Sequence, residues 1–420
     1  MTLCITNARH LGAPVDLLVD GDRVRTMTPA GQHPAPDGCE VFDAVGLVLM
    51  PGFIDAHVHL REPGFEYKED IASGLAAAAH GGFSAVLCMA NTKPVNDTAS
   101  VTSFMLERAA QSHPFGPRLH PVAAATVGLN GEGMAPLAEL KEAGCVAVSN
   151  DGRPVENAEL VRRVMEYAAD LGLIFIDHCE DPRLAGGWLM NEGEVSGFLG
   201  VKGQPAVSEA VQAARDIMLA EYLGLPVHIA HVSAGLTLDV IAWGKARGVQ
   251  VSAETCPHYL LLDDSALAGY NTAAKVSPPL RGATDREALC RAVKKGLIDI
   301  LVTDHAPHAA HEKDGTLDEA PCGITGLDLA LSLTWNLVRE NMLAEADMHR
   351  LWCKRPAEIF RLPWNGFAPG DPADFFLFDP DEVWTPGPDT MHSKSRNTPF
   401  LGQNLHGRVK GHWIGGRRVV

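Results

Sequence analysis

The 420-residue sequence predicts an α/β fold, a (β/α)8 TIM-type barrel joined to a small β-sandwich domain that both chain ends build together. From Pro51 onward, short apolar runs alternate with longer amphipathic segments, which is the pattern of parallel strands each followed by a helix. Both chain ends instead carry short strand-like runs separated by turn signals. A doubly wound open sheet is the alternative architecture, but no glycine-rich phosphate fingerprint in the sequence favours it.

The two chain ends are predicted to form one domain, residues 1–50 with 366–420, with the barrel of residues 51–365 inserted between them. At the N-terminal end, the pattern predicts strands at residues 3–6, 16–19, 41–43 and 47–50 and a loop at residues 31–38. At the C-terminal end, it predicts a turn and strand at residues 370–379 and a hairpin at residues 408–420, around Gly415 and Gly416.

The barrel region contains eight apolar runs that predict strands, at residues 52–58, 85–89, 119–124, 146–149, 174–177, 227–230, 249–253 and 298–303. The amphipathic segments between them predict helices, most clearly at residues 69–80, 99–111, 134–143, 157–171, 208–223, 237–247 and 285–295. Several of these helices are followed by a glycine, which suits a left-handed C-terminal cap: Gly144, Gly172, Gly224 and Gly248.

Composition limits the classes of partner and the compartment. The net charge of −17, from 35 basic and 52 acidic side chains, argues against nucleic acid and anionic membranes as partners. No apolar stretch approaches the roughly 20 residues that cross a bilayer, and the first residues lack a secretory signal pattern. The nine cysteines are scattered and include no Cys-x-x-Cys pair, which is typical of reduced thiols. We therefore expect a cytoplasmic protein.

His57 and His59 lie directly behind the apolar run that predicts the first barrel strand. Side chains two residues apart on a strand point to the same face, so the two imidazoles converge and Arg61 continues their row. Two neutral imidazoles on one face form half of a metal site, whereas two hydrogen-bonded core histidines are the structural alternative. The nearby guanidinium indicates an anionic substrate, because arginine binds carboxylates through two parallel hydrogen bonds.

Four further polar residues follow the carboxyl ends of predicted barrel strands: Asp151, His178, His231 and Asp304. In a barrel these ends share one face, where active sites lie. Singly, such residues are often helix caps or buried structural side chains. Together, four histidines and two carboxylates would hold two divalent ions, and zinc suits both ligand types. His228 is one residue out of phase with this pattern and is predicted to be structural.

These residues suit the hydrolysis of a cyclic amide or the reverse reaction, because a metal ion lowers the pKa of bound water from 15.7 to near neutrality. One carboxylate must accept a proton and deliver it to the departing nitrogen. Asp304 is the candidate for this catalytic role. Asp151 lies between the two histidine pairs in chain order and is the candidate for a carboxylate that bridges the two ions.

Four motifs together resemble the type I dihydroorotases of the amidohydrolase superfamily, and the resemblance covers nearly the whole chain. They are HVHLREPG at residues 57–64, NTKP at 91–94, DHCED at 177–181 and TDHAPH at 303–308. The resemblance implies zinc-dependent, reversible cyclisation of N-carbamoyl-L-aspartate to L-dihydroorotate in pyrimidine synthesis. It also implies two zinc ions, one held by His57, His59 and Asp304, the other by His178 and His231, with Asp151 bridging them.

The resemblance further implies a set of substrate-binding residues: His59, Arg61, Asn91, Ser277, His308, Cys322 and Gly323. Within this set, Arg61, Asn91 and His308 match the positions that hold the substrate carboxylate. Ser277 stands where the family usually has an asparagine, so that substrate contact differs here. Residues 309–320 are similar to the family's mobile active-site loop.

Two other functions share much of this pattern. A hydantoinase, dihydropyrimidinase or allantoinase would have the same fold, metals and chemistry, but its substrate would lack a ring carboxylate for Arg61, Asn91 and His308. A catalytically inactive, dihydroorotase-like scaffold of aspartate transcarbamoylase is disfavoured because all six predicted metal ligands are present. For an active enzyme, a homodimer and a complex with aspartate transcarbamoylase both stay open.

Overall fold

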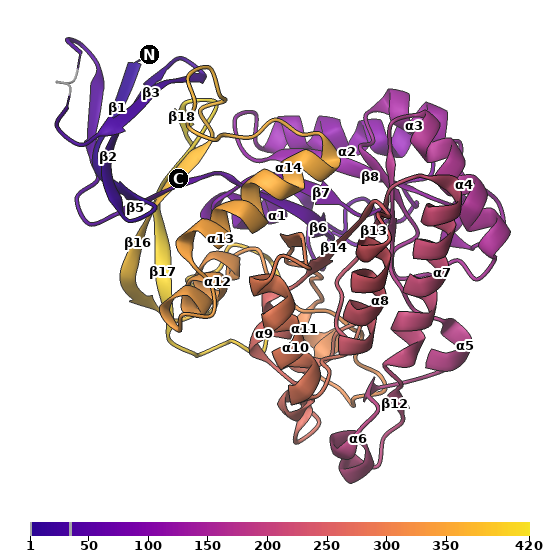
Figure 1. Cartoon of the computed structure of the whole chain (residues 1–420). Coiled ribbons are helices and arrows are strands. Elements are labelled where there is room, and N and C mark those ends of the chain that lie inside the picture. The colour runs from indigo at the N-terminus through magenta and orange to yellow at the C-terminus, as the bar shows by residue number, and fades with distance from the viewer. Residues whose placement is uncertain (1, 33–35) are drawn as a thin grey trace.

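The protein is built around a ring of eight parallel strands, with a second sheet from both chain ends beside it (Figure 1). The structure is a computed structural model and describes residues 2–32 and 36–420. The barrel strands follow one another around the ring as β6 (Phe53–Val58), β7 (Phe83–Cys88), β8 (Arg118–Ala124), β9 (Ala147–Ser149), β10 (Ile174–Asp177), β13 (Val227–Ile229), β14 (Val251–Thr255) and β15 (Ile300–Leu301). The predicted barrel is therefore confirmed, although β14 begins two residues later than expected and β15 is much shorter than expected.

The barrel closes between its first and last strands. The backbone N–H of His59 donates to the carbonyl of His305 at 2.9 Å, and Val58 forms a parallel bridge with His305. β15 ends early because the N–H of Thr303 donates to the carboxylate of Asp55 at 3.1 Å instead of continuing the backbone ladder. The last strand and the first are thus joined partly through a buried side chain.

Helices surround the ring, and the seven predicted ones are present: α1 (Ile71–His80), α2 (Ala99–Ser112), α3 (Leu137–Ala143), α4 (Ala158–Asp170), α7 (Val207–Leu223), α8 (Gly235–Ala246) and α10 (Ala283–Lys294). Gly144 and Gly224 end α3 and α7 with left-handed φ values of 119° and 65°, as predicted. Every residue of β6, β7 and β14 is buried, because side chains fill the interior and helices cover the outside.

Shorter elements that the sequence pattern did not predict fill the connections. They are η1 (Val127–Leu129), α5 (Pro182–Ala185), β11 (Met190–Asn191), α6 (Glu194–Leu199), β12 (Gly203–Gln204), α9 (Pro257–Leu261), η2 (Asp264–Leu267), η3 (Thr272–Ala274), α11 (Ala310–Lys313), α12 (Ala330–Arg339), α13 (Glu345–His349), η4 (Arg350–Lys354) and α14 (Arg355–Phe360). Among the residues that the structure describes, no helix combines the length and the apolar character needed to cross a bilayer.

The two chain ends form one continuous eight-stranded sheet in place of two separate sheets. Its strands are β1 (Thr2–His10), β2 (Ala13–Asp20), β3 (Arg23–Pro29), β4 (Glu40–Asp43), β5 (Val48–Pro51), β16 (Phe375–Trp384), β17 (Leu405–Ile414) and β18 (Arg417–Arg418). β3 was not predicted, and part of the predicted loop, residues 33–35, lies outside the described residues. β16 pairs antiparallel with both β5 and β17, which joins the ends as expected. The sheet has its own apolar core, in which Phe375 stacks on Trp413.

His412 on β17 connects this sheet to the barrel and should make folding stability depend on pH. Its buried ring donates from Nδ1 to the carbonyl of Ala79 at 2.8 Å and accepts at Nε2 from the Ser84 hydroxyl at 3.1 Å. Burial lowers the pKa of His412 from 6.5 to about 4, so the unfolded chain binds the proton more readily. The free energy that the neutral, buried His412 contributes to folding is therefore fully present above pH 6.5 and is lost as pH falls from 6.5 towards 4.

We expect His412 to contribute about 2 kcal/mol to the fall in unfolding free energy between pH 7 and pH 5. Urea unfolding at the two pH values measures it. The His412→Gln variant should lose less stability on acidification than the wild type. His311→Gln, at an exposed position, is the control and should follow the wild type. An unchanged pH dependence for His412→Gln would contradict the prediction.

Candidate functional site

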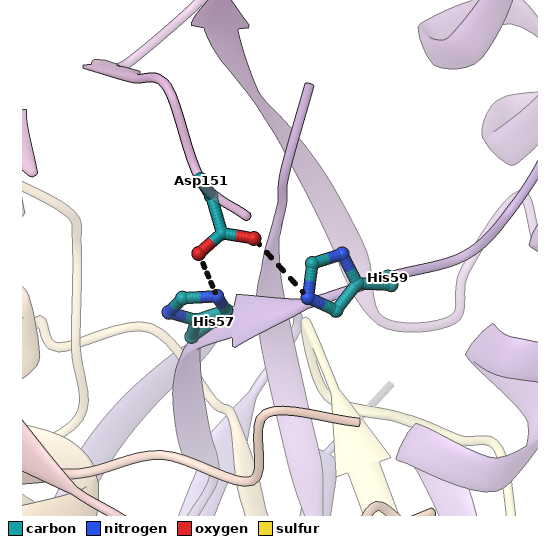
Figure 2. Close-up of side chains that lie close together, drawn as sticks. All are labelled: His57, His59 and Asp151. Carbon is teal, nitrogen blue, oxygen red and sulfur yellow. Dashed lines mark ion pairs between the residues drawn. The ribbon is translucent and has the colours of Figure 1, made fainter. Parts of the chain in front are cut away.

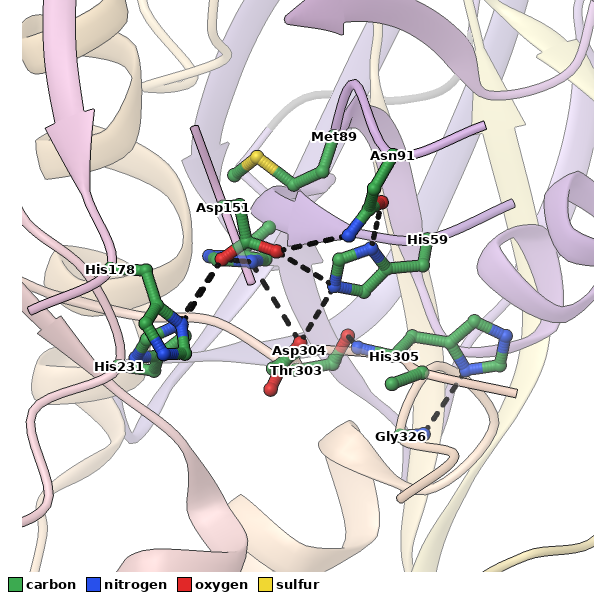
Figure 3. A network of polar contacts seen from close by, with 12 residues as sticks. His59, Met89, Asn91, Asp151, His178, His231, Thr303, Asp304, His305 and Gly326 are labelled. Carbon is green, nitrogen blue, oxygen red and sulfur yellow. Dashed lines mark hydrogen bonds and ion pairs between the residues drawn. The ribbon is translucent and has the colours of Figure 1, made fainter. Parts of the chain in front are cut away.

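The six predicted metal ligands come together at the carboxyl ends of the barrel strands; Figure 3 labels all of them except His57, which Figure 2 shows. Each lies near the end of a strand or within three residues after one, and all are at most 5% exposed: His57 in β6, His59 after β6, Asp151 after β9, His178 after β10, His231 after β13 and Asp304 after β15. The backbone there is unusual, with left-handed φ values of 29° at His231 and 44° at Asp304. Such conformations are costly for residues other than glycine and concentrate at functional sites.

His57, His59 and Asp151 form the first group (Figure 2). Nε2 of His57 lies 3.3 Å from Oδ1 of Asp151, and Nε2 of His59 lies 3.6 Å from Oδ2. Oδ1 of Asp304 lies 3.1 Å from Nε2 of His59 and 3.8 Å from Nε2 of His57. Two imidazoles and two carboxylates therefore face a common point.

His178, His231 and the same Asp151 form the second group. Nδ1 of His178 lies 3.0 Å from Nε2 of His231, and both nitrogens lie within 3.5 Å of Oδ1 of Asp151. Asp151 thus stands between the two histidine pairs in space, as it does in chain order. In each group, the potential ligand atoms lie within 4.8 Å of one another.

The donor set fits divalent metal ions. Nε2 of His57 is buried with no hydrogen-bond partner among the residues that the structure describes, although it faces two carboxylates. Burial alone would raise the pKa of Asp151, but the surrounding imidazoles lower it well below its usual value, so the carboxylate is ionised. Buried carboxylate and imidazole atoms that converge in this way can hold a cation between them, and they are ligands that zinc accepts.

A pocket of about 330 Å³ opens above these groups. All seven predicted substrate-binding residues line it, and so do five of the six predicted metal ligands, since His59 belongs to both sets: His59, Arg61, Asn91, Ser277, His308, Cys322, Gly323, Asp151, His178, His231 and Asp304. The structure therefore places the two predicted sets around one cavity. Their individual roles remain predictions.

One part of the pocket lining carries the positive charge of Arg61, which lies beside a neutral His308. Nε of Arg61 donates to the carbonyl of Pro307 at 3.1 Å, and Nε2 of His308 donates to the carbonyl of Cys322 at 2.8 Å. Burial, reinforced by Arg61 and Lys68, lowers the pKa of His308 to about 2. The imidazole is therefore neutral, and Arg61 is the cation in the pocket lining that can pair with a carboxylate.

Asn91 has a contact that the sequence pattern did not predict. Its Oδ1 accepts from Nδ1 of His59 at 2.7 Å, and its Nδ2 donates to Oδ2 of Asp151 at 3.3 Å. These two bonds leave Nε2 of His59 free to face the first group. In this structure Asn91 therefore orients two predicted ligands, in addition to lining the pocket.

Glu254 on β14 is a buried residue of the site that sequence reasoning missed, and it lies one position beyond the predicted strand. Its carboxylate accepts from Nδ1 of His57 at 2.8 Å and from Nε2 of His228 at 2.9 Å. Burial alone would raise the pKa of Glu254, but His57 and His228 lower it below its usual value. The signal that could have found it is a carboxylate directly after a predicted barrel strand, the same pattern that pointed to Asp151 and Asp304.

The other histidines and the predicted mobile loop lie outside the two groups. His305 accepts at Nδ1 from the N–H of Gly326 at 3.1 Å and pairs with Glu69, so it is structural (Figure 3). The predicted loop, residues 309–320, includes α11 and is anchored by Nζ of Lys313, which donates to the carbonyls of Thr272, Lys275 and Pro321. Its mobility remains a prediction.

Comparisons with known proteins agree with this geometry. A family model described as dihydro-orotase-like matches residues 46–235. A dihydroorotase from Geobacter metallireducens is 47% identical over 405 residues, which cover 96% of this chain and 95% of that protein. A dihydroorotase from Desulforapulum autotrophicum is 46% identical, over 99% of this chain and 97% of its own length. The chain belongs to the dihydroorotase family.

Solved structures show that this dihydroorotase-family chain shares its fold with other cyclic-amide enzymes. An L-hydantoinase from Arthrobacter aurescens superposes with a TM-score of 0.88 at 20% identity, covering 100% of this chain and 96% of that chain. A dihydropyrimidinase from Brevibacillus agri has a TM-score of 0.82 at 24% identity, with coverage of 100% and 95%. Identities this low establish the common fold and leave the substrate to the site residues.

Proposed function

We propose that this chain is a dihydroorotase, which interconverts N-carbamoyl-L-aspartate and L-dihydroorotate in pyrimidine synthesis. The observation that carries the proposal is the position of Arg61, which lines the same pocket as the imidazoles and carboxylates of the proposed metal centre. A substrate with both an amide to open and a carboxylate to bind fits these two features together. The relatives named dihydroorotase support the same conclusion. Hydantoin and allantoin lack the ring carboxylate.

The residues present would hold two zinc ions: His57, His59 and Asp304 for one, His178 and His231 for the other, and Asp151 between them. When bound, such ions supply Lewis acidity, which polarises an amide carbonyl and makes water a stronger acid. Without a metal, the cluster balances its carboxylates with protons, since Asp151 and Glu180 outweigh burial and raise the pKa of His178 to about 10.

The side chains of the pocket can perform the remaining steps. Arg61 binds the substrate carboxylate and sets the ring's orientation, and Ser277 and Gly323 line the same pocket. In ring opening, a carboxylate oxygen of Asp304 accepts the proton of the attacking water and returns it to the departing ring nitrogen. In ring closure, the same oxygen takes the proton from the ureido nitrogen and gives it to the carboxyl oxygen that departs; this oxygen leaves as hydroxide, which solvent protonates to water.

The direct test is ring opening of dihydroorotate by the purified protein, with metal content measured on the same sample. We expect turnover that disappears when a chelator removes the metal and returns when zinc is added back. Hydantoin and allantoin, assayed in parallel, should be much poorer substrates. Faster turnover of either one would overturn the proposed substrate, and activity that survives complete metal removal would overturn the proposed cofactor.

We further propose that the enzyme acts in the cytoplasm, in keeping with nine free cysteines. We also propose that residues 1–50 and 366–420 form one domain and residues 51–365 the other.

A homodimer and a complex with aspartate transcarbamoylase are both open for this enzyme. Size-exclusion chromatography with light scattering, with and without aspartate transcarbamoylase, distinguishes a monomer, a homodimer and a mixed complex.

A further inference from the structure

Glu254 lies at the centre of a buried chain of hydrogen bonds beneath the proposed metal centre. It is 0% exposed, and three donors converge on its carboxylate. Oε1 accepts from Nδ1 of His57 at 2.8 Å and from the backbone N–H of His231 at 3.2 Å, while Oε2 accepts from Nε2 of His228 at 2.9 Å. Glu254 therefore contacts residues of both histidine pairs.

These contacts determine which nitrogen of His57 carries a proton. Because Nδ1 donates to a carboxylate, a neutral His57 has its lone pair on Nε2. That nitrogen faces Oδ1 of Asp151 at 3.3 Å and has no hydrogen-bond partner among residues 2–32 and 36–420. The opposite tautomer would break a buried charge-assisted bond and direct an N–H at the place where a cation belongs.

The chain of hydrogen bonds continues beyond Glu254, away from the site, and holds its carboxylate in place. Nδ1 of His228 accepts from the hydroxyl of Ser252 at 2.7 Å, and the His228 ring packs edge-on against Phe360. Ser252 thus fixes His228, which in turn donates to Glu254. Glu254 and His228 are fully buried and Ser252 is 9% exposed, so solvent has little access to the bonds between Glu254 and the two imidazoles. His228 is structural, as predicted, and its structural task is to support the carboxylate.

We propose that Glu254 is a positioning residue, which keeps Nε2 of His57 free for a metal ion and supplies a negative charge behind that ligand. The proposal rests on the proposed function in one respect, the metal that the site holds. A buried carboxylate behind a histidine ligand typically changes metal affinity by 10- to 100-fold.

Glu254→Gln tests the proposal, because it keeps the side chain's shape but replaces one acceptor oxygen with an NH2 donor. Either His57 or His228 must then change tautomer or lose its bond. We expect zinc to bind about 10- to 100-fold more weakly to this variant, measured by competition with a chelator. The matched control is Asp299→Asn, at a buried carboxylate that accepts from the N–H of Ala253 in the middle of β14. Its zinc affinity should equal that of the wild type.

A second measurement, on the wild-type protein, does not depend on whether the Glu254 variant folds. In the zinc-loaded protein, ¹⁵N-histidine NMR should show His57 protonated at Nδ1 and unprotonated at Nε2, with His57→Gln used to assign the signals. A zinc affinity for Glu254→Gln within twofold of that of the wild type, or a His57 proton on Nε2, would overturn the proposal. Neither readout depends on turnover. A protein that binds zinc as expected but does not open dihydroorotate would refute the proposed function alone.

Discussion

Asp304→Asn should lower the rate of dihydroorotate ring opening by about 10²- to 10⁴-fold, the range that proton transfer by a positioned side chain contributes. Asp304 lines the pocket, and its Oδ1 lies 3.1 Å from Nε2 of His59. An amide at this position still offers an oxygen to a metal ion but cannot accept the proton of the attacking water. We therefore expect much of the metal to remain bound while turnover is lost.

The measurement is kcat together with metal content for the same preparation. Asp299→Asn again serves as the control, because Asp299 is buried beside the opposite end of β15 and pairs with Lys245 and Arg355. That variant should lose stability and keep its kcat. A near-normal kcat for Asp304→Asn would show that another group accepts the proton. Loss of metal in parallel with activity would show that Asp304 acts mainly as a ligand.

Arg61→Met should weaken the use of dihydroorotate mainly through binding. Methionine keeps much of the length and apolar character of the side chain but cannot form charge-assisted hydrogen bonds. Losing such a pair costs about 1.5–3 kcal/mol, which corresponds to roughly a 10- to 150-fold fall in kcat/KM. Most of this fall should appear as a higher KM, since the substrate carboxylate does not change during the reaction.

Steady-state kinetics with dihydroorotate and with hydantoin separate the two components of this effect. The uncharged ring of hydantoin has no carboxylate for Arg61, so any slow turnover of it should change little. Arg108→Met is the matched control, because Arg108 pairs with Glu62 outside the pocket. Equal losses for both substrates would mean that Arg61 supports the structure of the pocket and does not bind the carboxylate.

The sequence was most informative where local chemistry repeats. The barrel strands are rich in apolar residues because most of their residues are buried, and glycines such as Gly144 and Gly224 end helices because they adopt positive φ at low cost. The position of a polar residue just after a strand was enough to place Asp151 and Asp304 at one face, since the ends of parallel strands share an edge.

The sequence was least informative where a contact joins distant segments. His57 and Glu254 are 197 residues apart, and no local pattern records their hydrogen bond. β15 is short because Asp55, 248 residues earlier, accepts from Thr303. Asn91 likewise orients His59 and Asp151 through contacts that only the closed barrel creates. These features depend on register and packing, which the order of residues does not state directly.

The closure of the ring at His59 and His305 constrains when a working enzyme can exist during synthesis. The ribosome synthesises His59 long before Asp304, which is 245 residues further along the chain. A nascent polypeptide that ends before the eighth strand therefore lacks Asp304 and the backbone hydrogen bond from His59 to His305. We expect the six side chains to assemble only after the eighth strand has been made, so truncated translation products should be inactive.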